Sequence, residues 1–92
     1  MGRGMDYIYS IDNQEILIEA DQKDTRKDVV ARYVRSRKEK GITQAELARR
    51  AGIPRTNITR FESGDYNPSL EMMVRIAAAL GMRLQVELSE RN

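Results

Sequence analysis

Cysteine and histidine are both missing from this chain of 92 residues. Their absence excludes disulfide bonds, thiolate or imidazole ligands for a metal, and catalysis by a cysteine or histidine side chain. Aspartates and glutamates are present, but no spacing among them organises an acid–base pair or a metal cluster. We therefore expect no enzymatic activity, no metal and no cofactor.

Long apolar runs are missing as well. The longest apolar stretch of the second half, residues 72–80, is interrupted by Arg75, and a membrane span needs about 20 apolar residues. With 40% apolar and 33% charged residues, the composition is that of a globular protein, and the length fits one small domain. The first residues carry no apolar run of the kind found in secretory signals. We expect a cytoplasmic protein that does not bind a membrane.

Charge is distributed unevenly along the chain, although the net charge is only +2. Residues 1–24 carry a net charge of −4, residues 25–64 carry +7 from eleven basic and four acidic side chains, and the remainder carries −1. A basic middle section is suited to a polyanion such as a nucleic acid. A solvated surface rich in Lys and Arg explains the same distribution equally well.

Apolar and polar residues alternate in two short sets near the N-terminus, which is the pattern of β-strands. The first set is Tyr7, Tyr9 and Ile11, and the second is Ile16, Ile18 and Ala20. Asp12 and Asn13 between them suit a turn. The pattern predicts a hairpin within an acidic segment of residues 1–24, although residues 15–23 also fit a helix.

From Thr25 the apolar period becomes that of a helix, and four helices are expected over residues 25–40, 44–51, 54–63 and 70–80. Their expected first residues or caps are Thr25, Thr43, Pro54 and Ser69, and their expected stops are Gly41, Gly52, Gly64 and Gly81. The apolar stripe of the first helix is Val29, Val30, Tyr33 and Val34, and that of the last is Leu70, Met73, Ala77 and Leu80. Thr43 and Glu46 form a capping box, which makes the second helix well defined.

The C-terminal segment, residues 82–92, alternates again. Apolar Leu84, Val86 and Leu88 are separated by polar residues, which predicts a strand over residues 83–88 with one buried face. A lone strand leaves backbone groups unpaired and must find a partner. The candidates are the N-terminal hairpin and the same strand of a second copy, which makes these three apolar residues candidates for a dimer contact.

Residues 44–63 have the arrangement of a helix-turn-helix, in which two short helices are joined by a tight turn that contains a glycine. Small and apolar residues stand at the positions that would face a common core: Leu47, Ala48, Ala51, Ile58 and Phe61. The sequence resembles the lambda-repressor/Cro type of helix-turn-helix proteins, the xenobiotic-response-element type of bacterial regulators. The resemblance rests on GITQAELARRAGI at 41–53, RFESG at 60–64, PSLE at 68–71 and IAAALG at 76–81.

The resemblance implies a mainly α fold, with a lambda-repressor-like four-helix DNA-binding domain over residues 25–81 and a C-terminal β-strand and possible N-terminal β-hairpin outside it. It further implies that the helix 54–63 enters the major groove of double-stranded DNA and reads bases there. The matching positions are Arg55, Thr56, Asn57, Thr59 and Arg60. Their chemistry agrees independently, because Arg binds guanine with two hydrogen bonds, Asn pairs with adenine, and Thr meets a thymine methyl group.

Other residues are candidates for the DNA backbone. Gln44 lies at the start of a helix, where free N–H groups and the helix dipole favour a phosphate, and the matching Gln of the family contacts the DNA backbone. Further candidates for phosphate contacts are Arg35, Lys38, Lys40, Arg49 and Arg50, of which several are expected to be solvated charges only.

Arg37 differs from these because it falls on the apolar stripe of its helix, where an unpaired charge is costly. It therefore needs a carboxylate, and the resemblance implies that Glu62 supplies it. We expect this ion pair to hold the scaffold together and to take no direct part in reading DNA.

Two functions follow as hypotheses. The first is a dimeric transcriptional repressor that binds a palindromic operator. The second is a protein-interaction module, an antitoxin of the HigA or HipB type, whose acidic residues 1–24 contact a basic toxin and whose C-terminal strand helps to build a homodimer. The two are compatible, because antitoxins of this type commonly repress their own operon.

Overall fold

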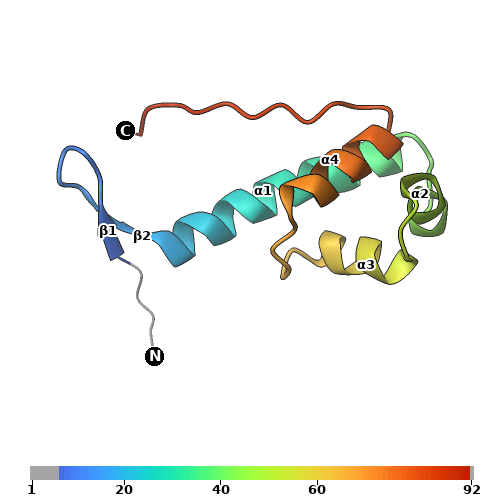
Figure 1. Ribbon diagram of the computed structural model, residues 1–92, viewed down its shortest axis with the longest axis horizontal. Helices are drawn as coiled ribbons and strands as arrows, with labels where there is room; N and C mark the ends of the chain where they lie inside the picture. The colour runs from blue at the N-terminus through green and yellow to red at the C-terminus, as the bar shows by residue number, and fades with distance from the viewer. Residues whose placement is uncertain (1–6, 92) are drawn as a thin grey trace.

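The computed structural model describes residues 7–91, which form four helices and a small hairpin. The elements are β1 (Tyr7–Tyr9), β2 (Glu15–Leu17), α1 (Ile18–Glu39), α2 (Gln44–Ala51), α3 (Arg55–Ser63) and α4 (Leu70–Ala79). In Figure 1, α1 runs along the molecule. The shorter helices α2, α3 and α4 lie beside the C-terminal half of α1, and the hairpin lies at the N-terminus of α1. The predicted mainly α, four-helix fold is confirmed. No helix within residues 7–91 is long and apolar enough to cross a membrane.

The hairpin is present, but its second strand is shorter than predicted. Antiparallel pairing joins Tyr7 to Leu17, Ile8 to Ile16 and Tyr9 to Glu15. In the turn, Asn13 adopts a left-handed φ of 63°, which Asn tolerates better than most residues. Ile18 and Ala20, which the alternation placed in the strand, belong to α1.

The start of α1 corrects the prediction of a helix from Thr25. The helix begins at Ile18, so the expected boundary between residues 24 and 25 falls inside it, and Thr25 caps nothing. The first turns contain few apolar residues, so they have no helical stripe that periodicity could detect. They are nevertheless rich in Glu, Ala, Gln and Lys, which favour helix. The alternative helical interpretation of residues 15–23 was the better one from Ile18 onwards.

The core lies between α1 and the three shorter helices. Its fully buried side chains are Leu47, Ile58, Phe61 and Ile76, and Val30, Tyr33, Ala48, Ala77 and Leu80 complete it. All five helix-turn-helix core positions named from the sequence are buried. Of the predicted stripe of α4, Ala77 and Leu80 are buried and Met73 packs against the core, whereas Leu70 is 60% exposed; Ile76, which the stripe did not include, is fully buried.

Local caps define the two helices of the motif, and one half of the predicted capping box is present. The Thr43 hydroxyl accepts a hydrogen bond from the Glu46 N–H at 3.0 Å, and this bond begins α2, whereas the Glu46 carboxylate binds Arg49 and Arg50. Gly52 ends α2 with a φ of 69°, a conformation that glycine adopts without strain. Pro54, with a φ of −61°, then stands at the N-cap of α3. Local sequence signals thus set the turn between α2 and α3.

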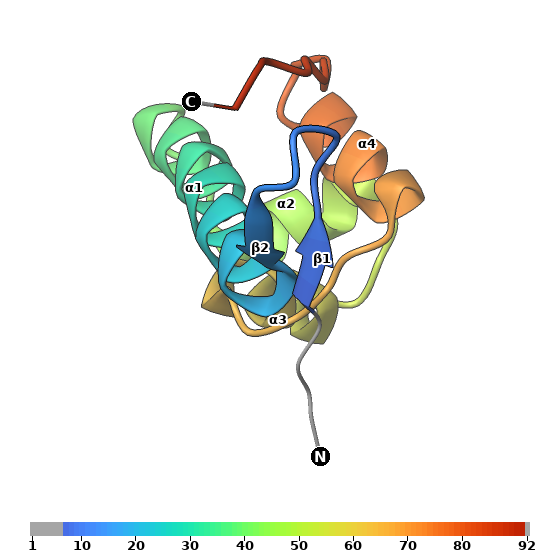
Figure 2. The ribbon, with the colours of Figure 1, turned by 90° about the vertical axis from the view of Figure 1, so that its left-hand side faces the viewer.

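Residues 82–91 correct the prediction of a C-terminal strand. Within residues 7–91 this segment has no strand partner, and β1 pairs only with β2, so pairing with the hairpin does not occur. The segment runs back past α1 towards the hairpin end (Figures 1 and 2), where Arg91 contacts Asp21 at 2.7 Å. Leu84 packs partly against the core, whereas Val86 and Leu88 are 75% and 95% exposed. A strand needs a neighbour, and a single chain supplies none here.

Candidate nucleic-acid interface

Helix α3 has one buried and one polar face. Ile58 and Phe61 anchor the buried face in the core. The five predicted base-reading residues occupy the rest of the helix: Arg55, Thr56, Thr59 and Arg60 are exposed, and Asn57 is partly buried. The helix therefore presents a row of hydrogen-bonding side chains from a fixed backbone.

A buried ion pair holds α3 against α1. The Arg37 guanidinium donates two hydrogen bonds to Glu62, from Nε to Oε2 at 2.7 Å and from NH2 to Oε1 at 3.0 Å. Its NH1 group donates to the Ile42 carbonyl oxygen at 2.8 Å. The two charged side chains are only 11% and 8% exposed. The structure thus contains the pair predicted from the sequence, in the two-bond geometry that Arg and carboxylates favour.

Gln44 is bound to the same carboxylate. Its Nε2 donates to Glu62 Oε1 at 2.9 Å, and its Oε1 accepts from the Thr59 hydroxyl at 3.2 Å. The Gln44 amide therefore has a fixed orientation at the first turn of α2, with one Nε2 hydrogen left for another acceptor. We call Arg37, Glu62, Gln44 and Thr59 the Glu62 cluster. It joins α1, α2 and α3 at the edge of the polar face.

Arg49 and Arg50 are less available than predicted, because both bind Glu46. Arg49 approaches Glu46 at 2.5 Å and 3.0 Å, and Arg50 does so at 2.5 Å. Hydrogen bonds from Arg49 and then Arg50 lower the pKa of Glu46 to about 2, and the same contact raises the pKa of Arg49. The two arginines remain 70% and 53% exposed, so they can still reach a phosphate. The charge of Glu46 offsets part of their positive charge.

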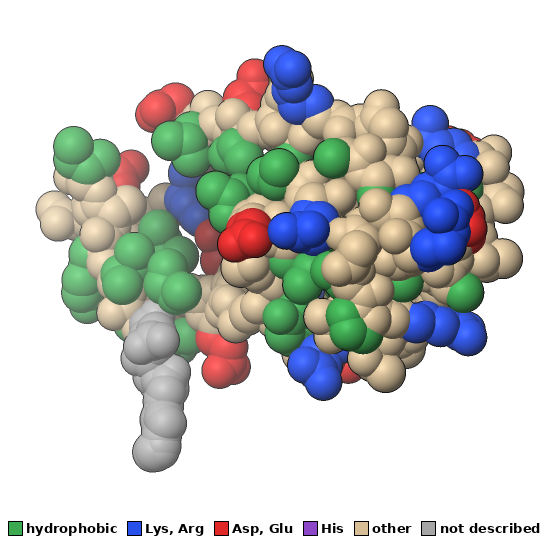
Figure 3. All heavy atoms as spheres, turned by 45° about the vertical axis from the view of Figure 1, so that its right-hand side comes forward, with side chains coloured by type: hydrophobic (Ala, Val, Ile, Leu, Met, Phe, Trp, Pro, Cys, Tyr) green, Lys and Arg blue, Asp and Glu red, His purple; other side chains and the backbone are tan. Residues whose placement is uncertain are grey.

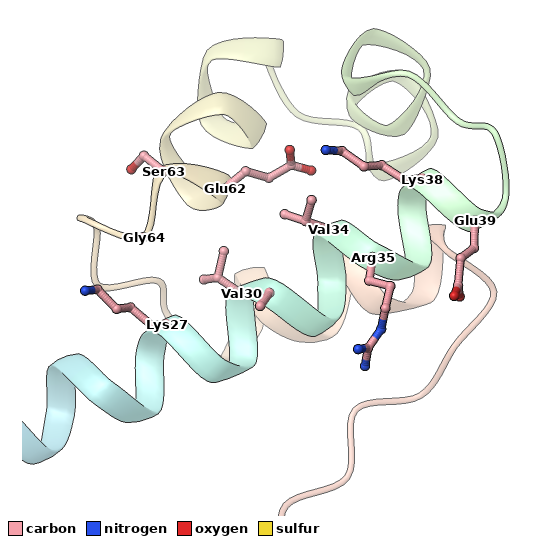
Figure 4. Close-up of a pocket in the computed structure, with 10 residues that line it drawn as sticks. Lys27, Val30, Val34, Arg35, Lys38, Glu39, Glu62, Ser63 and Gly64 are labelled. Atoms are coloured by element: carbon pink, nitrogen blue, oxygen red, sulfur yellow. The ribbon is translucent and has the colours of Figure 1, made fainter.

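The remaining phosphate candidates lie on and after the C-terminal half of α1. Arg35 and Lys38 line a shallow groove of about 520 Å³ between α1 and the end of α3, with Val30 and Val34 in its floor. In Figure 4, Lys38 points towards Glu62 and α3, whereas Arg35 points away from them. Lys40 is exposed at the C-terminus of α1. Of Arg35 and Lys38, Lys38 is therefore the one directed towards α3.

Basic side chains gather at one end of the molecule. In the space-filling view of Figure 3, Lys and Arg concentrate at the end opposite the hairpin, whereas the hairpin shows mostly hydrophobic side chains. Such a concentration of positive charge attracts a polyanion. Within residues 7–91, no group of three or more acidic residues is placed to hold a metal ion.

The loop between α3 and α4 contributes residues that the sequence analysis missed. The Arg60 guanidinium lies over the Tyr66 ring, 5.6 Å from its centre. Arg26 Nε donates to the Gly64 carbonyl oxygen at 2.7 Å, and Arg26 also donates to the Asn67 side chain at 2.5 Å. The one feature of the sequence that could have indicated the contact with Arg60 is a tyrosine two residues after Gly64, the glycine that ends α3. Arg26 had none, because its partners lie about 40 residues away.

Known proteins that resemble this chain in sequence include helix-turn-helix regulators and a phage repressor. The sequence profile of the helix-turn-helix family matches residues 35–86. An uncharacterized HTH-type transcriptional regulator of Methanothermobacter thermautotrophicus is 56% identical over 45 residues, which are 49% of this chain and 65% of that protein. The immunity repressor protein of Bacillus phage phi105 is 37% identical over 56 residues, 61% of this chain and 39% of the repressor. This chain thus spans just under two thirds of the first relative and less of the second.

One solved structure resembles nearly the whole chain. It is titled "Toxin-Antitoxin module from Streptococcus pneumoniae", and it matches with a TM-score of 0.64 and 29% sequence identity. The match covers 90% of this chain and 85% of that one. It therefore extends well beyond the residues matched by the family profile.

The Glu62 cluster generates a stability prediction. Glu62→Gln leaves the Arg37 guanidinium nearly buried without a countercharge, and we expect a loss of about 2 to 3 kcal/mol in the free energy of unfolding. Glu46→Gln is the matched control, because it removes a carboxylate whose arginine partners are solvated, and its effect is expected to be small. Urea denaturation followed by circular dichroism measures both. Equal stability of the two variants would contradict the structural importance of the cluster.

Proposed function

We propose, from the premise that this chain belongs to the lambda-repressor/Cro type of the helix-turn-helix family, that it is a sequence-specific transcriptional regulator that binds double-stranded DNA. It acts as a repressor in the cytoplasm, without catalytic activity. Helix α3 lies in the major groove and reads base edges. The observation that carries this proposal is the outer face of α3, where Arg55, Thr56, Asn57, Thr59 and Arg60 project from a helix anchored by Ile58 and Phe61.

Different side chains contact the bases and the phosphates of the DNA in this proposal. Arg55 and Asn57 stand in the first turn of α3, the part of a reading helix that contacts base edges, and their chemistry matches guanine and adenine. Gln44 directs its free amide hydrogen to a phosphate beside the N-terminus of α2, where the helix dipole adds to the attraction. Thr59 already donates its hydroxyl hydrogen to Gln44, so it meets DNA through its methyl group.

A dimer follows from the small size of the reading surface. One such helix contacts only a few base pairs, and two copies on one face of the duplex need reading helices about 34 Å apart. Residues 82–91 offer the means of association. Residues 83–91 have no strand partner within residues 7–91, and antiparallel pairing with a two-fold mate would satisfy their backbone groups and cover Val86 and Leu88. The operator is then a palindrome.

Removal of side chains from α3 tests the reading role. Arg55→Ala and Asn57→Ala are each expected to weaken binding to an operator selected from random duplexes by about 1 to 3 kcal/mol, with a much smaller effect on random DNA. Arg32→Ala is the control, because Arg32 is an exposed arginine paired with Asp28 on α1, away from α3. Fluorescence anisotropy with both duplexes measures the affinities. A loss that is equal on operator and random DNA would show that Arg55 binds phosphate only.

Deletion of residues 83–92 tests the dimer. The truncated protein should sediment as a monomer, keep its helical circular dichroism signal, and lose most of its affinity for the operator. Leu84 is the residue of this segment that packs against the core, so the truncation removes one core contact and leaves the four helices in place. An intact protein that is monomeric at tens of micromolar, or a truncated one that remains dimeric, would refute pairing through this segment and leave the reading helix unaffected.

A second candidate function is that of an antitoxin. The observation that favours it is the Streptococcus pneumoniae toxin–antitoxin structure, whose likeness covers 90% of this chain. The hairpin has the character of a protein contact, because Tyr7, Tyr9 and Ile11 are 54%, 68% and 105% exposed. Acidic Glu15 and Glu19 lie exposed close by, which suits a basic partner.

The two functions are separable by variants of the hairpin. If a small basic protein is encoded beside this gene, calorimetry with the purified pair should detect binding, and Tyr9→Ser with Ile11→Ser should abolish it while operator binding persists. Arg55→Ala should weaken operator binding and leave binding of the neighbouring protein unchanged. Failure of such a neighbouring protein to bind the intact chain would remove the antitoxin function and leave the regulator.

A further inference from the structure

Tyr66 lies in the loop between α3 and α4, directly beside the side chain of Arg60. We propose that Tyr66 is a positioning residue that holds Arg60 in the conformation that contacts DNA, and so contributes to sequence preference without contacting a base itself. The proposal rests on the proposed function, because it needs α3 to lie against DNA. It adds a residue outside the reading helix to the determinants of specificity.

The contact with Tyr66 leaves the hydrogen-bonding capacity of Arg60 available. Its guanidinium carbon is 5.6 Å from the ring centre, within the range of a cation–π contact. A guanidinium carries five N–H donors, and a cation–π contact does not need them as hydrogen bonds, so they can bind guanine. Among the hydrogen bonds and ion pairs found within residues 7–91, none uses the Arg60 side chain. The ring thus restrains this arginine without occupying its donors.

The restraint matters because Arg60 is exposed and long. A free arginine samples many rotamers, and binding must select one of them at a cost in entropy. An arginine that already contacts the ring in the unbound protein has lost part of that freedom, so less is lost when DNA binds. Arg60 is therefore expected to bind its target more tightly with the ring than without it.

The loop that carries the ring is tied to α1. Asn67, next to Tyr66, accepts hydrogen bonds from Gln22 at 2.8 Å and from Arg26 at 2.5 Å. Arg26 also binds the Gly64 carbonyl oxygen at 2.7 Å, on the other side of Tyr66. The loop is thus tied to α1 on both sides of the tyrosine. Gln22 and Arg26 belong to the part of α1 that precedes the residues matched by the family profile.

The experiment compares Tyr66→Leu with Tyr66→Phe in the full chain. Leucine keeps an apolar side chain but has no π-face, whereas phenylalanine keeps the ring and loses only the hydroxyl group. Tyr66→Leu should weaken binding to the selected operator about three- to tenfold, with random duplex affected less than about twofold. Tyr66→Phe should bind both duplexes like the parent protein. Thermal unfolding of each variant checks that the fold is retained.

Two further measurements separate positioning from other roles. In an Arg60→Ala background, Tyr66→Leu should have no additional effect, because there is no arginine left to position. In the DNA-free protein, the ring current of Tyr66 should shift the NMR signals of the Arg60 side-chain protons, and this shift should disappear in Tyr66→Leu and persist in Tyr66→Phe. The NMR measurement does not depend on DNA binding or on complete retention of affinity.

Three outcomes would overturn the proposal. The first is that Tyr66→Leu binds the operator as well as Tyr66→Phe does. The second is that Tyr66→Leu weakens binding as much in the Arg60→Ala background as in the parent protein. The third is that Tyr66→Phe loses as much affinity as Tyr66→Leu, which would identify the hydroxyl group as the contact. Each of these leaves the role of Arg55 and Asn57 intact. A parent protein that prefers no duplex sequence would contradict the proposed function itself, and the positioning role with it.

Discussion

The buried ion pair between Arg37 and Glu62 is the interaction on which the arrangement of this molecule depends. A guanidinium at 11% exposure is tolerable only with a carboxylate in bonding geometry, so the pair fixes the separation and rotation of α1 and α3. The same carboxylate orients Gln44, and the same guanidinium binds the carbonyl oxygen of Ile42 before α2. One charge pair therefore sets the relative positions of three helices.

This constraint divides the surface into parts with separate tasks. Because the ion pair and the buried Ile58 and Phe61 hold α3 in place, four of its five base-reading candidates take no part in the Glu62 cluster, and Thr59 is the exception. The long α1 extends beyond the helix-turn-helix, carries the apolar hairpin at one end and ties the loop after α3 through Arg26. DNA reading and protein contact can therefore occupy separate parts of the molecule, with α3 away from the hairpin (Figure 1).

The sequence predicted well whatever local chemistry specifies. The Thr43 cap, the left-handed Gly52 and the buried Leu47 and Ile58 each follow from a residue and its near neighbours. It failed where tertiary contacts decide. The first turns of α1 lack an apolar stripe, and the predicted strand at residues 83–88 had assumed a neighbour that a single chain does not contain.

The candidate site shows the same division. The polar positions on α3 were predictable because the resemblance to the family identified them and their side-chain chemistry agreed. The place of Arg37 on an apolar stripe predicted a carboxylate partner, and the resemblance identified that partner as Glu62. The contact between Arg60 and Tyr66 was not, since it depends on how the loop after α3 folds back. That path is set by Arg26 and Asn67, which are 41 residues apart in the sequence.

The proposed function depends above all on DNA reading by α3. Selection of bound duplexes from a random pool is the measurement that decides it. Base reading by a two-fold dimer should enrich one two-fold symmetric sequence with half-sites about one helical turn apart, and a selected pool indistinguishable from the starting pool would contradict this role of α3.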